Sequence, residues 1–93
     1  LILDAGPANF YEQKRIRGAI NMPLSLFDIV YMMTLRGEEK GKKVIVYGGT
    51  ISKLYDLELA NKLILRGHKD VRVLQGGMVA WEKEGYPVEK GKK

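Results

Sequence analysis

The residues best suited to bind a ligand lie in one stretch near the middle of the chain. Gly48, Gly49 and Thr50 directly follow the short apolar run 44–47, and an apolar pattern typical of a helix begins a few residues later. Backbone N–H groups at the start of a helix are free to bind anions, and hydroxyl and ammonium groups assist them. We therefore predict a binding site for a small anion, made of Gly48, Gly49, Thr50, Ile51, Ser52 and Lys53. A glycine-containing loop that only reverses the chain direction remains an alternative.

Three further polar side chains are weaker candidates. Asp4 ends an apolar run, so it is expected at the carboxyl end of a strand, where ligands of open parallel sheets bind. We include Asp4 in the predicted site, although hydrogen bonds to loop amides would explain it equally well. Asp56 is expected to cap the helix that follows it. His68 comes after a helix-ending glycine, and we expect it to be structural.

Covalent chemistry is restricted by the absence of cysteine from all 93 residues. No disulfide, thiolate metal site or cysteine nucleophile can form. We expect no metal ion and no cofactor in this chain.

The pattern of apolar residues predicts alternating strands and helices. Strands are expected at 1–4, within 18–22, at 44–47 and at 71–74, and helices at 8–14, 24–35, 57–66 and 78–84. Phe10 and Tyr11 are expected on the buried face of the first helix, and residues 89–93 are expected to be frayed. This alternation is typical of an α/β domain with a parallel sheet covered by helices on both faces.

Charge and hydropathy argue against two classes of partner. The net charge of +5 is spread evenly along the chain, and its densest lysine runs, 40–43 and 90–93, flank a strand and form a tail. A nucleic-acid surface would need a basic face interleaved with exposed aromatic residues, so a nucleic-acid or anionic-surface binder is the disfavoured alternative. No apolar run is long enough to span a membrane.

Two segments resemble the rhodanese-like family. The first is Ile16-x-Gly18-Ala19-Ile20-Asn21-Met22-Pro23. The second, which is the more specific, is Gly76-Gly77-x-x-x-Trp81-x-x-x-Gly85-x-Pro87-Val88. The resemblance covers nearly the whole chain and implies a three-layer α/β/α fold with a small, mainly parallel sheet. It also implies one domain at 1–89 followed by a basic tail at 90–93. A further helix and edge strand, with which most family domains begin, would precede Leu1 and are expected to be absent.

The resemblance fails at the residues that matter for catalysis. Family members active in sulfur transfer have a cysteine directly after the central strand, where this chain has Gly48. The arginine expected near the first strand is replaced by Gly6. The resemblance therefore implies a catalytically inactive homologue that acts as a binding or regulatory module. Its expected partner is a small anion at the loop from Gly48 to Asp56, another protein or a neighbouring domain. A sulfurtransferase whose cysteine has been lost or replaced at position 48 is the alternative.

Overall fold

The computed structural model describes residues 1–50 and 52–91, and its centre is a four-stranded parallel sheet with the strand order β3-β1-β4-β5. The sheet strands are β1 (Ile2–Asp4), β3 (Ile20–Asn21), β4 (Val44–Tyr47) and β5 (Val71–Val73). A separate antiparallel pair consists of β2 (Lys14–Ile16) and β6 (Val88–Lys90). The helices are α1 (Ala8–Gln13), the 3₁₀ turn η1 (Leu24–Leu26), α2 (Phe27–Thr34), α3 (Tyr55–Leu65) and α4 (Gly77–Lys83).

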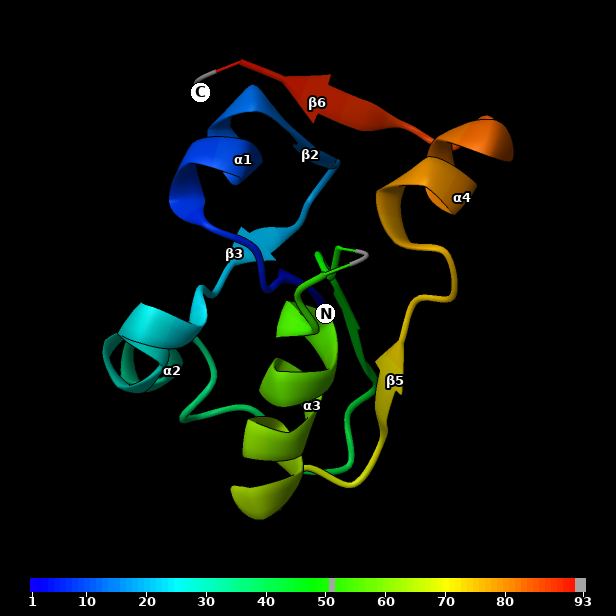
Figure 1. Cartoon of the computed structure of the whole chain (residues 1–93). Coiled ribbons are helices and arrows are strands. Elements are labelled where there is room, and N and C mark those ends of the chain that lie inside the picture. The colour runs from blue at the N-terminus through cyan, green and yellow to red at the C-terminus, as the bar shows by residue number, and fades with distance from the viewer. Residues whose placement is uncertain (51, 92–93) are drawn as a thin grey trace.

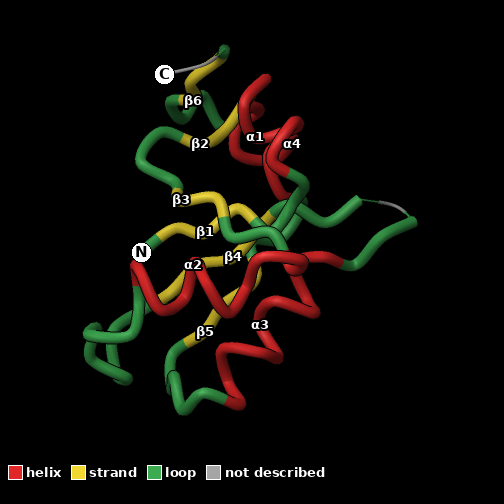
Figure 2. Tube along the Cα trace, turned by 90° about the vertical axis from the view of Figure 1, so that its left-hand side faces the viewer, coloured by secondary structure: helices red, strands yellow, loops and turns green. Residues whose placement is uncertain are grey.

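Helices cover both faces of the sheet because side chains of a strand point alternately to its two sides. Leu3, Val44 and Val46 are fully buried in the core that α2 and α3 cover. Tyr47, the next residue of β4, belongs to a second core with Ile16 on the opposite face. Figure 2 shows the four strands edge to edge, with α2 and α3 on one side and α1 and α4 at the other end of the molecule. The predicted α/β fold with a mainly parallel sheet is confirmed.

The carboxyl ends of the central strands lie side by side. In the parallel register Asp4 of β1 pairs with Tyr47 of β4 and with Asn21 of β3. The backbone then continues this pairing beyond the strands, because the Ala5 amide donates to the Tyr47 carbonyl over 2.7 Å. The chain segments that leave β1 and β4 are therefore held together at one edge of the sheet, which is where the sequence placed the site.

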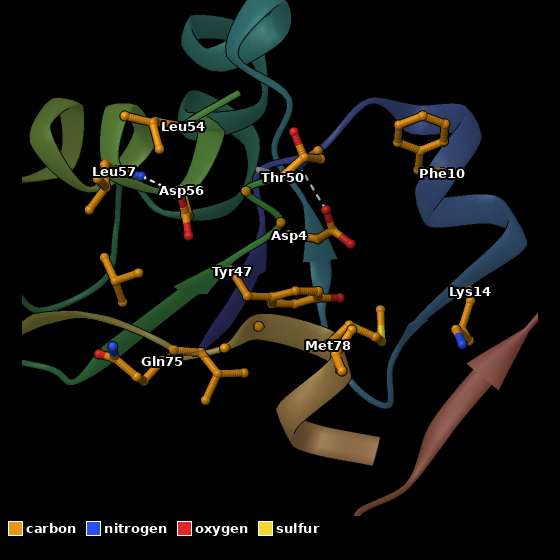
Figure 3. Close-up of a pocket in the computed structure, with 18 of the residues that line it drawn as sticks. Asp4, Phe10, Lys14, Tyr47, Thr50, Leu54, Asp56, Leu57, Gln75 and Met78 are labelled. Carbon is orange, nitrogen blue, oxygen red and sulfur yellow. Dashed lines mark hydrogen bonds between the residues drawn. The ribbon is translucent and has the colours of Figure 1, made fainter. Parts of the chain in front are cut away.

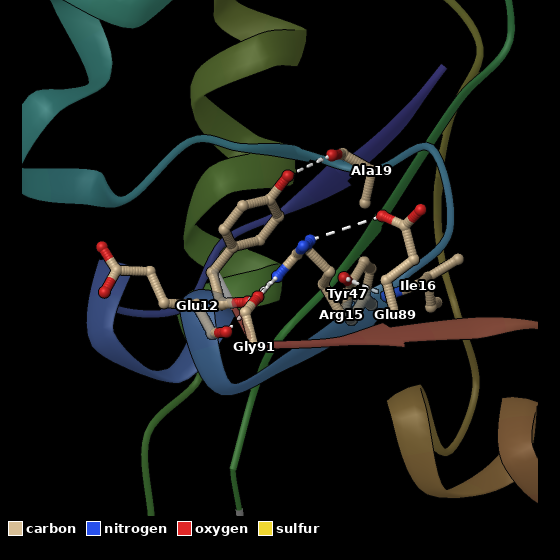
Figure 4. A network of polar contacts seen from close by, with 8 residues as sticks. Glu12, Arg15, Ile16, Ala19, Tyr47, Glu89 and Gly91 are labelled. Carbon is tan, nitrogen blue, oxygen red and sulfur yellow. Dashed lines mark hydrogen bonds and ion pairs between the residues drawn. The ribbon is translucent and has the colours of Figure 1, made fainter. Parts of the chain in front are cut away.

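The antiparallel pair β2 and β6 ties the end of the chain to α1, as seen at the top of Figure 1. Its central residue is Arg15, whose side chain is only 3% exposed. Arg15 Nη1 donates to the carbonyls of Gly91 (2.6 Å), Tyr11 (3.1 Å) and Glu12 (3.4 Å), as Figure 4 shows. Its Nε lies 3.5 Å from Glu89, so the buried charge has both carbonyl and carboxylate partners.

Two expectations about local structure need correction. Glu89 and Lys90 were expected to be frayed, but they pair with β2 in strand β6. Phe10 was expected on a buried face, yet its side chain is 54% exposed, and only Tyr11 packs against the second core. The errors at Phe10 and at residues 89–90 have one cause. Helix α1 packs against β2 and β6, and no local sequence pattern shows that these two distant strands pair.

Helix α3 also differs from its prediction at its start. It begins at Tyr55, two residues earlier than expected, so Asp56 lies inside its first turn. The residue before the helix is Leu54, and no side chain caps the helix there. The prediction that Asp56 is an N-cap is therefore wrong, although its carboxylate still accepts the Leu57 amide over 2.9 Å. None of the helices in the described part of the chain is long and apolar enough to cross a membrane.

Candidate functional site

A groove of about 950 Å³ opens at the carboxyl ends of β1, β4 and β5. Asp4, Tyr47 and Gly48 lie where β1 and β4 end, and the turn from β5 into α4 closes the groove opposite α3. Figure 3 shows Asp4 and Tyr47 in the middle of this groove, with Asp56 on the α3 side and Phe10 and Lys14 on the α1 side. The predicted position of the site, at the end of the central strand, thus coincides with a cavity.

Gly48 has a backbone conformation and an environment that only glycine fits. Its φ angle is +114°, a region that side chains of L-amino acids rarely adopt. A Cβ atom built there would lie 2.8 Å from the backbone nitrogen of Gly6 and 3.0 Å from that of Ala5. The chain after β1 therefore occupies the space that a side chain at position 48 would need.

The second glycine of the loop is packed against a carboxylate. A Cβ atom on Gly49 would overlap the side chain of Asp56. Beyond this glycine the loop is closed on itself, because the Thr50 amide donates to the Lys53 carbonyl over 2.7 Å. In return the Lys53 amide donates to the Thr50 hydroxyl over 3.0 Å. The Thr50 amide was expected to bind an anion, but it already donates its hydrogen bond within the loop.

Asp4 is a buried carboxylate at the floor of the groove. Its side chain is 5% exposed, and its Oδ1 accepts the Gly6 amide over 2.8 Å. Burial raises the pKa of Asp4 above its ordinary value, while its hydrogen bonds with the Gly6 amide and the Tyr47 hydroxyl act in the opposite direction. Asn21 stabilises this turn by donating to the carbonyls of Asp4 (3.1 Å) and Gly6 (3.0 Å). The structure therefore keeps an acidic group in a place where its charged form is disfavoured.

Tyr47 has a structural role beside Asp4. Its hydroxyl accepts the Ile16 amide over 3.0 Å and joins the central sheet to β2. Burial raises the pKa of Tyr47 far above its ordinary value, and the nearby Asp4 charge adds to this shift. The hydroxyl therefore stays protonated and is a poor proton acceptor for chemistry in the groove.

The rim of the groove is made of apolar side chains that are exposed to solvent. They are Phe10 (54% exposed), Leu54 (56%), Leu57 (46%) and Val79 (75%). These residues come from α1, the loop before α3, α3 itself and α4. Exposed apolar side chains gathered around a concave site are typical of binding surfaces.

The structure brings most of the predicted site residues together. Asp4, Gly48, Gly49, Thr50 and Ser52 line the groove, whereas Lys53 does not. Ile51 lies outside the described residues. The apolar rim and the turn at Gly76 and Gly77, which also line the groove, were not among the predicted site residues. No sequence signal identifies these rim residues, because the sequence does not tell which apolar side chains of a short helix remain exposed after packing.

The described residues offer little for metal binding or nucleophilic chemistry. Among residues 1–50 and 52–91 no group of three or more histidine and acidic side chains could hold a metal ion. His68 follows the C-terminal end of α3, the helix whose first turn lines the groove, and it is buried with its Nε2 2.7 Å from the Tyr31 hydroxyl. His68 does not line the groove, which agrees with the expectation that this histidine is structural.

Comparison with known proteins gives the family. The family model described as "Rhodanese-like domain" matches residues 1–84, which is most of the chain. The chain belongs to the rhodanese-like domain family. The rhodanese-like domain also matches a solved rhodanese-like domain from Anabaena sp. with a TM-score of 0.83 and 29% identity, over 99% of this chain and 93% of that one. No curated protein matches it.

Two more distant structures share the fold. A thiosulfate sulfurtransferase from Pseudomonas aeruginosa matches with a TM-score of 0.83 and 23% identity, over 97% of this chain but only 16% of that one. A rhodanese from E. coli, solved with anions, matches with a TM-score of 0.69 and 21% identity, over 97% and 96% of the two chains. Identities this low show a common fold and nothing about shared chemistry.

Proposed function

We propose that this rhodanese-like domain binds a partner in the groove at the carboxyl ends of β1, β4 and β5, and that it does not transfer sulfur. The single observation that carries the proposal is Gly48. This glycine stands where the family resemblance places a cysteine, and the chain contains no cysteine at any position. Sulfur transfer by a covalent persulfide needs a thiolate that attacks, holds and releases the sulfur atom, so this chain lacks the reacting group.

The geometry around Gly48 supports the absence of a reacting side chain at this position. Its positive φ angle and the close approach of the Gly6 backbone leave no room for one. What remains is a cavity with an apolar rim, and such a cavity can bind without reacting. A small anion at the loop, as predicted from the glycines, stays an alternative ligand of this same groove.

An amide NMR titration with a neutral aromatic probe, 2-phenylethanol, tests whether the groove binds apolar groups. We expect saturable shifts at Gly6, Gly49 and Met78, which line the groove. Leu57→Ser should weaken binding several-fold. Leu65→Ser is the matched control, because Leu65 lies on the same helix, is 86% exposed and does not line the groove.

Shifts outside the groove, or equal effects of the two leucine substitutions, would overturn the proposal. In that case the exposed apolar side chains of the rim would not form a binding surface.

A further inference from the structure

The charged groups of the groove indicate what kind of partner it accepts. We infer that the groove binds a segment of a partner protein in which a lysine or arginine is flanked by apolar side chains. This inference rests on the proposed function and specifies its ligand. It differs from the anion expected from the sequence, and the argument depends on the two carboxylates at the glycine pair.

The carboxylates of Asp4 and Asp56 flank two consecutive residues. Asp4 Oδ1 lies 3.0 Å from the position of a Cβ on Gly48, and the Asp56 carboxylate fills the position of a Cβ on Gly49. Both side chains line the groove, one from the end of β1 and the other from the first turn of α3. The loop that is expected to attract an anion is therefore bordered on both sides by carboxyl groups. A cation bound beside them would favour their charged form.

Positive charge in the groove is already paired. Among the described residues that line it, Lys14 is the only cationic side chain, and its Nζ lies 2.7 Å from Glu82 Oε1. Lys53 belongs to the loop but does not line the groove. The overall charge of +5 is spread over a surface on which salt screens charges beyond about 8 Å, so nearby carboxylates dominate inside the groove.

The apolar rim favours the cationic side chains of lysine and arginine over small hydrated cations. A small hydrated ion gains nothing from Phe10, Leu57 or Val79. Lysine and arginine have aliphatic stems that pack on apolar surface while the charged end reaches an acidic group. Apolar residues next to such a side chain in an extended segment would cover the exposed rim. The combination of acidic floor and apolar rim thus fits a peptide segment better than a free ion.

Selection of random nonapeptides on the immobilised domain tests this inference without assuming a sequence. We expect most selected peptides to contain lysine or arginine next to apolar residues. Against a selected peptide, Asp56→Asn should lower the affinity about threefold to tenfold and Asp4→Asn by at least as much, since Asp4 is more deeply buried. Asp28→Asn is the matched control, because it removes the same charge from a residue that is outside the groove and paired with Arg66.

Different negative results would contradict the inferred peptide ligand and the proposed binding function of the groove. Enrichment of acidic peptides, or cationic peptides whose affinity is unchanged by both groove substitutions, would overturn the inference while leaving the groove a binding site. If no peptide binds and 2-phenylethanol also leaves the groove amides unshifted, the proposed function fails as well. A variant that loses the wild-type pattern of amide signals is set aside, and the Asp56 variant, whose side chain is only half-buried, then decides.

Discussion

Gly48 and Gly6 approach each other so closely that a Cβ atom on Gly48 would lie 2.8 Å from the Gly6 nitrogen. Gly6 follows β1 and Gly48 follows β4, and the two strands are hydrogen-bonded neighbours in the sheet. A separation below 3.0 Å is tighter than real Cβ contacts, and the atom opposite is backbone, which cannot rotate away. The position expected to hold the family cysteine is therefore closed to any side chain unless the backbone shifts.

Substitutions of Gly48 should accordingly destabilise the domain. We expect Gly48→Ala and Gly48→Cys to lower the free energy of unfolding by about 2 kcal/mol or more, because positive φ and steric overlap act together. Urea denaturation measures this change. Gly18→Ala separates the effect of positive φ from that of steric overlap, because Gly18 has a φ of +84° with open space around it. This substitution should lower the free energy of unfolding less than Gly48→Ala does. Equal stability of Gly48→Ala and wild type would contradict the described loop.

Arg15 should be essential for attachment of the last strand. Arg15→Met removes a buried cation that bonds three carbonyls, and we expect a loss of about 2–4 kcal/mol in the free energy of unfolding. Amide hydrogen exchange should show the largest loss of protection in β6. Arg17→Met, at an exposed position of the following turn, is the control and should change little. Comparable losses in both variants would show that the Arg15 contacts do not hold the strand.

His68 should make stability depend on pH in the range where histidine titrates. Burial, and then the positive charge of Lys40, lower the pKa of His68 below its ordinary value of about 6.5. Around it, Tyr31 of α2 contacts its Nε2, Lys40 donates to the Tyr31 hydroxyl over 3.1 Å, and Arg66 stacks on the Tyr31 ring. Because the unfolded chain takes up the proton first, stability should fall as pH decreases below about 6.5.

Chemical denaturation between pH 5 and pH 8 measures this dependence. Since the chain contains a single histidine, His68→Gln should flatten the curve in that range while the carboxylates still titrate at lower pH. A slope unchanged by His68→Gln would assign the dependence to other groups.

The sequence predicted the central sheet, and it predicted a site at the end of the strand 44–47, where the structure has a groove. Both predictions rest on local patterns. The run Val44 to Tyr47 is β-branched and aromatic and lies between a lysine cluster and a glycine pair. The end of such a strand in a parallel sheet is where chain segments converge. Pairing of β2 with β6 joins residues more than seventy positions apart and leaves no local pattern. The φ angle of Gly48 and the carboxylate beside Gly49 likewise depend on how β1 and α3 pack, so they had to come from the structure.

The most direct test of the account is whether the domain transfers sulfur at all. Thiosulfate and cyanide are incubated with a high concentration of the domain, and the thiocyanate formed is measured against a protein-free control. Because no thiol exists to carry the sulfur atom, the account predicts thiocyanate at the background level. Thiocyanate formation that rises in proportion to the protein and survives repurification would contradict it.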